Sequence, residues 1–140
     1  MPEQHLPLLI YQKYHWLTGF ISSYLKDSPW PDLSRPHVVI LGGIYQGESK
    51  AIRLAEMVGV SRQAVYKSLK ELEAKGLVVQ KQNPEQLNSA IVELSNEGQA
   101  CIDYVDNMIN ILEENLVKRH GKSKVEAAME ILKADWTVTN

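Results

Sequence analysis

The stretch between Ser61 and Lys70 carries side chains whose types and spacing could read nucleic acid. Arginine and glutamine can form paired hydrogen bonds with guanine and adenine, and lysine suits phosphate. Val65, Leu69 and Leu72 recur at helical spacing and leave the polar residues on the opposite face. An ordinary helix with a solvated outer face has the same pattern, so the surrounding elements must decide. The candidate reading residues are Ser61, Arg62, Gln63, Tyr66, Lys67 and Lys70.

Charge is distributed unevenly along the chain. The 140 residues have a formal net charge of −2, yet residues 50–81 hold seven lysines and arginines against three glutamates, a net charge of +4. A basic segment in an otherwise acidic chain is a local attraction for anionic partners. The hydrophobic fraction of 44% and the charged fraction of 23% are typical of a globular protein, and the length suits one domain.

Hydrophobic spacing and the positions of serine, proline and glycine predict a mainly α fold with a small β-hairpin, an α+β class. Ser49 and Ser61 stand where helix caps are expected, and Gly59, Gly76 and Gly121 stand where helices should end. The segment "NPEQLN" contains the turn formers Asn83, Pro84 and Asn88, so we expect it to be the whole hairpin turn. The expected helices are 7–26, 36–46, 50–58, 61–75, 96–119 and 123–135, and the expected strands are 77–82 and 89–95.

A helix, a short turn at Gly59, a capped helix and a hairpin follow one another in the order of a winged helix-turn-helix. In that motif the second helix enters the major groove of double-stranded DNA, which places the outward residues of 61–75 against base edges and phosphates. We therefore expect one domain over residues 1–140. It should contain a winged-helix lobe over 36–95 and helical regions for dimerisation over 7–26 and 96–135.

The segment "AIRLAEMVGVSRQAVYKSLKELEAKGLVVQ", with the hairpin and "VELSNEGQA" after it, resembles the MarR family of bacterial transcriptional regulators. The resemblance rests on the pair Leu54 and Ala55, on the run 76–78, and on Leu94, Ser95 and Gly98. It implies a homodimer with intertwined first and last helices, bound to pseudo-palindromic operator DNA. The function predicted is sequence-specific transcriptional regulation, with a ligand-responsive repressor favoured over an activator.

The wing departs from the family pattern. Members of the family commonly carry Asp-x-Arg before a small residue in the wing. Here Gln86 and Asn88 occupy those places before Ser89. Asn88 can donate a hydrogen bond to DNA but brings no charge into the minor groove, where arginine is favoured. This bare wing supports an alternative, a winged-helix module that docks a protein partner and binds DNA weakly or not at all.

Aromatic residues gather in the first quarter of the chain. In the resembling family small aromatic acids bind between the dimerisation helices and the DNA-binding lobe, which makes these residues candidate walls of an effector pocket. At helical spacing they are equally suited to the core of a dimer, and we favour that role. The residues are Tyr11, Tyr14, His15, Trp16, Phe20 and Trp30.

Other chemistry finds little support in the sequence. Cys101 lies on an apolar helical stripe with no cation adjoining it, so we expect a packing role. The four histidines lack metal-ligand spacing, and no phosphate loop or nucleophile motif is present. We therefore expect no enzyme, no cofactor and no metal. With no apolar run long enough for a bilayer and no signal-peptide pattern, we expect no membrane partner and a cytoplasmic protein.

Overall fold

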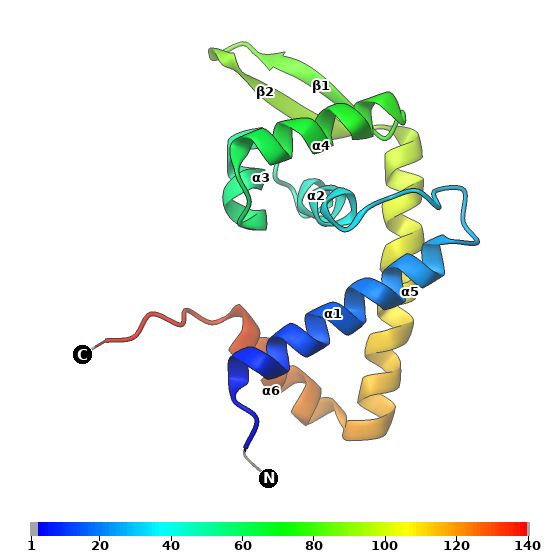
Figure 1. Ribbon diagram of the computed structural model, residues 1–140, viewed down its shortest axis with the longest axis vertical. Coiled ribbons are helices and arrows are strands. Elements are labelled where there is room, and N and C mark those ends of the chain that lie inside the picture. Colours follow the sequence, from blue (N-terminus) through cyan, green and yellow to red (C-terminus); the bar gives the residue numbers. More distant parts are fainter. Residues whose placement is uncertain (1–2, 140) are drawn as a thin grey trace. The chain divides into compact units, whose positions relative to one another are not determined.

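The computed structural model describes residues 3–139, and for residues 86–89 it describes the backbone only. The chain divides into two compact units, Met1–Val105 and Asp106–Asn140. The boundary falls inside one long helix, α5 (Asn96–His120), which runs from the first unit into the second (Figure 1).

The first unit contains four helices, a hairpin and the start of α5. In Figure 1 the hairpin lies along one side of α4, and α2 and α3 lie on the other side of that helix. Leucine, isoleucine and valine side chains between these elements are buried and form the core. The elements are α1 (Leu6–Leu25), α2 (Arg35–Tyr45), α3 (Ala51–Val58), α4 (Arg62–Ala74), β1 (Val78–Asn83) and β2 (Gln86–Leu94). The predicted fold class, with its helices and hairpin, is confirmed.

Helix α2 runs through the centre of this unit, as its apolar sequence predicts. Ile40 and Leu41 are at most 1% exposed. Gly43 allows α3 to approach closely, because a Cβ at this position would lie 2.8 Å from Cδ2 of Leu54. The helix begins at Arg35, one residue before the expected start, since Ser34 caps it.

The predicted cap at Ser49 is wrong. Lys50 occupies the N-cap position of α3 and makes no side-chain capping bond. The backbone here bonds to the hairpin instead: Val92 N–H donates to the Ser49 carbonyl at 2.7 Å, and Lys50 forms an antiparallel bridge with Ile91. The start of α3 is therefore held by β2, a long-range contact that overrides the local capping signal.

The hairpin turn is shorter than expected. Val78 pairs with Leu94 and Gln82 with Ala90, and a bulge follows between Gln82 and Asn83. The Asn83 side chain accepts a hydrogen bond from Glu85 N–H at 3.0 Å. This side-chain bond closes the turn over residues 84 and 85, so residues 86–88, expected in the turn, belong to β2.

Two glycines are required where the end of α4 packs against the start of α5. Gly76, with φ of 75°, ends α4, and Leu77 N–H bonds back to the Leu72 carbonyl at 3.0 Å. The Ser95 hydroxyl donates to the Gly76 carbonyl at 2.6 Å and accepts from Gly98 N–H at 3.0 Å. A Cβ on Gly98 would lie 1.9 Å from the Leu77 carbonyl oxygen, so only glycine fits here.

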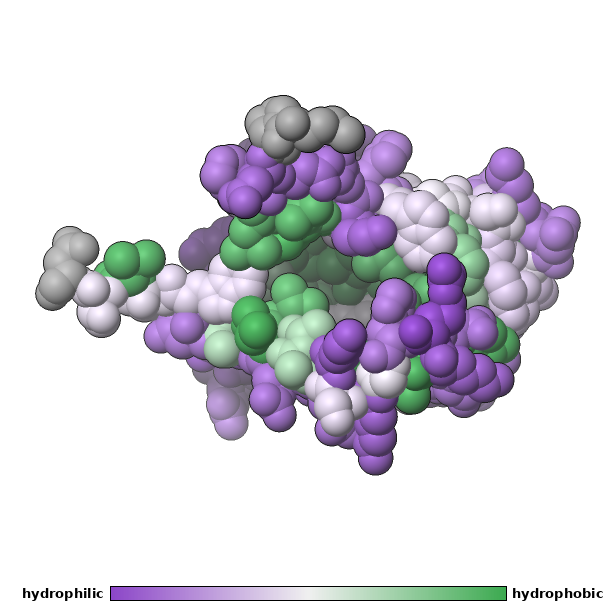
Figure 2. All heavy atoms as spheres, turned by 90° about the horizontal axis from the view of Figure 1, so that it is seen from below, coloured by the Kyte–Doolittle hydropathy of each residue, from purple (hydrophilic) through white to green (hydrophobic). Residues whose placement is uncertain are grey.

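The second unit consists of the rest of α5 and α6 (Lys122–Lys133), which are separated at Gly121 with φ of 92°. Large apolar side chains on these helices are exposed, among them Ile131 at 60% and Leu132 at 61%. In the first unit α1 likewise exposes its apolar residues, with Leu6 at 54%. Figure 2 shows hydrophobic side chains reaching the surface among hydrophilic ones.

Candidate nucleic-acid interface

Helix α4 is seated by its apolar face. Val65, Leu69 and Leu72 are at most 1% exposed, as their spacing predicts. The hydroxyl of Ser61 accepts a hydrogen bond from Ala64 N–H at 3.1 Å, which confirms this residue as the cap. Before it, Gly59 adopts φ of 73° and its N–H bonds to the Ala55 carbonyl at 3.0 Å, the sharp turn that the motif requires.

The opposite face of α4 is open to solvent. Arg62, Gln63, Lys67 and Lys70 are all exposed, and Tyr66 is 40% exposed. Within the part of the chain that the structure describes, no salt bridge engages Arg62, Lys67 or Lys70. Their charges are therefore available to a partner, and the structure brings the six candidate reading residues of this helix onto one accessible surface.

Two further cations lie at the start of α3. Lys50 and Arg53 are exposed, and Lys50 adjoins the hairpin through its bridge with Ile91. In helix-turn-helix proteins the first helix of the motif crosses the DNA backbone. The basic segment 50–81 contains both residues. The sequence alone gave no reason to assign either of them to a DNA contact, because the bridge between Lys50 and β2 is a tertiary contact.

The wing differs from α4 in charge. Its lysine, Lys81, forms an ion pair with Glu93 at 3.0 Å, and both side chains are more than half exposed. Glu85 is exposed in the turn at the end of the hairpin. The side chain of Asn88, the predicted contact in the wing, lies outside the residues that the structure describes. The described part of the wing therefore carries one lysine–glutamate ion pair and one further carboxylate, that of Glu85.

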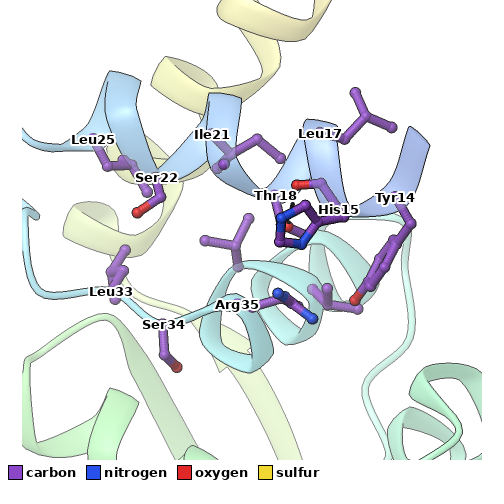
Figure 3. A pocket seen from close by; sticks show the side chains of 13 residues that line it. Tyr14, His15, Leu17, Thr18, Ile21, Ser22, Leu25, Leu33, Ser34 and Arg35 are labelled. Atoms are coloured by element: carbon purple, nitrogen blue, oxygen red, sulfur yellow. Dashed lines mark hydrogen bonds between the residues drawn. The ribbon is translucent and has the colours of Figure 1, made fainter. Parts of the chain in front are cut away.

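A cavity of about 470 Å³ lies between α1 and α2. Its wall is mainly apolar; Leu33 and Ser34 come from the segment before α2, and Arg35 is the first residue of that helix (Figure 3). The guanidinium of Arg35 lies 5.2 Å from the centre of the Tyr14 ring, so a cation and an aromatic face stand together at this cavity. His15, from α1, also contributes to the lining.

The six aromatic-rich candidate residues do not share one site. Tyr14 and His15 line the cavity, whereas Trp16 and Phe20 stack on each other with ring centres 5.2 Å apart. Tyr11 is 66% exposed. Trp30 lines a second cavity of about 190 Å³, and its indole N–H donates to Glu97 at 3.2 Å while its ring packs edge-on against Tyr104. Trp30 therefore anchors the loop before α2 to α5.

Cys101 is fully buried on α5. Burial raises the pKa of its thiol to about 11, and the nearby carboxylate of Glu97 acts in the same direction. The thiol is therefore protonated near neutral pH and is a poor nucleophile.

Among residues 3–139, no cluster of three or more potential metal-ligating side chains is found, and no described helix is both long and apolar enough to cross a membrane.

The arrangement of α2, α3, α4 and the hairpin defines a winged helix. The family model of the sugar-specific transcriptional regulator TrmB matches residues 40–92, from α2 to β2.

Solved structures match over nearly the whole chain. FabT of Streptococcus pneumoniae, in complex with DNA, superimposes with a TM-score of 0.78 at 13% identity, covering 90% of this chain and 89% of that one. MepR of S. aureus, also with DNA, gives 0.76 at 17% identity over 93% and 94% of the two chains. Wild-type MarR of E. coli, in its apo form, gives 0.75 at 21% identity over 94% and 97%.

At these identities the likeness establishes a shared fold. The chain therefore has the fold of MarR-family winged-helix regulators, and the resemblance predicted from its sequence is confirmed at that level.

Proposed function

We propose that this protein is a sequence-specific DNA-binding transcriptional regulator that acts as a homodimer on a pseudo-palindromic operator. The observation that carries the proposal is the exposed face of α4, whose cations have no ion-pair partner among the described residues while its apolar face is buried. An exposed surface of Arg62, Gln63, Lys67 and Lys70 on a capped helix matches the chemistry of base edges and phosphates. The DNA complexes of FabT and MepR share the fold and support the same partner.

The direct test is selection of genomic DNA fragments by the purified protein, followed by sequencing of the retained fragments. We expect enrichment of an inverted repeat whose half-site centres lie about one helical turn apart. Substituting alanine at Arg62, Lys67 and Lys70 together should abolish the enrichment. A matched control removes the same charge from exposed lysines of α5 and α6 (Lys118, Lys124 and Lys133) and should retain it. Equal loss in both variants would indicate general charge attraction without sequence reading.

Dimerisation is supported by the exposed apolar side chains of α1 and α6. Ile131 and Leu132 are each at least 60% exposed, far more than such side chains usually are in an isolated protein, and a second copy could cover them. Sedimentation should show a dimer for the wild type and a folded monomer for the Ile131→Asp/Leu132→Asp variant. A stable wild-type monomer at micromolar concentration would contradict the proposal.

A response to a small effector is supported by the cavity between α1 and α2. Its apolar wall, with Arg35 beside the ring of Tyr14, suits a small aromatic molecule with a negative charge. Screening aromatic carboxylates by thermal shift should give stabilisation that Arg35→Ala removes. Binding that lowers DNA affinity would favour a repressor that the effector releases from its operator.

A second candidate function is a protein-interaction module without DNA reading. The exposed carboxylate of Glu85 at the end of the hairpin favours it because it would repel phosphate, and the ion pair of Lys81 with Glu93 adds no net positive charge to the wing. In the selection experiment this alternative predicts no enriched repeat, together with retention of one specific protein from the same cell extract.

A further inference from the structure

His37 is a buried histidine that lies outside the exposed face of α4 proposed to contact DNA. It lies in the first turn of α2 and is 4% exposed. Both ring nitrogens are engaged: Ser34 N–H donates to Nδ1 at 3.1 Å, and Nε2 lies 2.7 Å from Oε2 of Glu71. A backbone N–H can only donate, so Nδ1 is unprotonated. The hydrogen therefore sits on Nε2, which donates to the Glu71 carboxylate, and the ring is held in one tautomer.

The two bonds of His37 join elements with different roles. Ser34 caps α2 and belongs to the wall of the cavity between α1 and α2. Glu71 lies on α4, one helical turn after Lys67, and its side chain is 42% exposed on the other side. The apolar contacts that seat α4 are non-directional and tolerate small rotations of the helix. A short hydrogen bond to a carboxylate is directional, and it adds a constraint on the rotation of α4 and on its position along its axis.

We propose that His37 is a positioning residue for DNA reading, which sets the orientation of α4 through Glu71 and connects that helix to the cap of α2. The inference rests on the proposed function. It differs from a purely structural role, in which His37 would only complete the capping box of α2 through Ser34. The two roles use different nitrogens of the ring, so substitutions can separate them.

The test uses two amide variants that each keep one of the two bonds. In His37→Asn the amide oxygen stands near the position of Nδ1 and retains the bond from Ser34, while the donor to Glu71 is lost. In His37→Gln the amide nitrogen stands near the position of Nε2 and retains the donor to Glu71. The measurements are the affinity for the selected operator, the affinity for an unrelated duplex of equal length, and the midpoint of thermal unfolding.

We expect His37→Asn and Glu71→Ala to lower the ratio of operator to unrelated affinity by about tenfold, the size of one lost charge-assisted bond. His37→Gln should keep the ratio within about threefold of the wild type although it loses the capping bond. The double variant His37→Asn/Glu71→Ala should lose no more than either single variant, because both remove the same contact. Full retention of the ratio in His37→Asn, or additive losses in the double variant, would overturn the proposal.

Nuclear magnetic resonance of the free protein separates this inference from the proposed function. The imidazole nitrogen shifts should report the tautomer with hydrogen on Nε2, and His37→Asn should shift the backbone amide signals of residues 62–70 while His37→Gln should not. A wild type that selects no duplex would refute DNA reading, and with it the role of His37 in that reading. Unchanged α4 signals in His37→Asn, in a protein that does select an operator, would refute the positioning role alone.

Discussion

Helix α4 and the wing are neighbours in the same lobe, yet they present opposite electrostatic character. On α4 the cations Arg62, Lys67 and Lys70 have no ion-pair partner among the described residues. On the hairpin, Lys81 is paired with Glu93 at 3.0 Å and Glu85 is exposed in the turn. The attraction of a polyanion for this lobe is therefore stronger at α4, and at Lys50 and Arg53 near the start of α3, than at the hairpin. Under the proposed function, α4 would supply the positive charge for the major groove, and the wing would bring little positive charge to the minor groove.

Truncating a buried apolar side chain of α4 should have the largest effect on stability. Leu69→Ala truncates a side chain with 0% exposure, and we expect the free energy of unfolding to fall by about 2–5 kcal/mol. On the hairpin, Val79 is 43% exposed, and Val79→Ala should change the same quantity by less than about 0.5 kcal/mol. Urea unfolding of both variants makes the comparison. Similar losses would show that the hairpin surface is buried in solution against another chain.

Sequence preference should depend on the first turn of α4. Arg62→Ala and Gln63→Ala should each cost about 1–3 kcal/mol at one base-pair position per half-site, because each removes a possible paired contact with a base. The measurement is binding of each variant to a set of operators with single base-pair changes. If Arg62→Ala leaves the preference of the wild type untouched, the helix is oriented differently in the groove.

Salt dependence should distinguish the free lysines from the paired one. Lys67→Ala and Lys70→Ala should each weaken binding to all sequences and reduce the slope of log K against log salt by about one unit per protomer. Lys81→Ala serves as the matched control, since Glu93 already neutralises that charge, and it should change the slope less. Equal changes at all three positions would contradict the difference between helix and wing.

Adding charge to the wing should make it resemble α4. Asn88→Arg should tighten binding to many sequences and steepen the salt slope by about 0.9 for each added phosphate contact. In the wild type, replacing A·T-rich flanks of the operator with G·C-rich flanks should alter affinity by less than about 1 kcal/mol. A strong flank dependence would show that the wing reads the minor groove without arginine, and an unchanged slope in Asn88→Arg would show that the hairpin does not reach DNA.

The smallest expected change concerns the acidic turn. Glu85→Gln removes a carboxylate from the exposed end of the hairpin, and it should raise affinity for every duplex by less than about 1 kcal/mol, since exposed charges interact weakly. Glu93→Gln should raise it more, because it also frees Lys81. Both gains should disappear at high salt. No gain in either variant would place the wing beyond the reach of the phosphates.

Short-range sequence patterns were sufficient to predict α4 and its exposed face. Ser61 caps α4, Gly76 ends it, and Val65, Leu69 and Leu72 are buried as their spacing predicts. Each of these features depends on residues within a few positions of one another, so it can be recognised from sequence. The outward placement of the cations on α4 follows directly from the same periodicity.

Contacts between distant segments decided the rest. Ser49 has the chemistry of a cap, yet its backbone bonds to β2, and a bond between His37 and Glu71 spans two helices. The candidate aromatic residues do not share one site for the same reason, since Trp30 bonds to Glu97 and, of the six, only Tyr14 and His15 line the cavity between α1 and α2.

The sequence by itself determined the helices, the cap of α4 at Ser61 and the face of α4 that meets solvent, because short-range periodicity and backbone preferences specify them. Only the tertiary structure decided which charges are neutralised, which polar side chains are joined and where a cavity forms. Those outcomes depend on the distances between atoms that are far apart along the chain, and ion pairs and hydrogen bonds fall off steeply with distance.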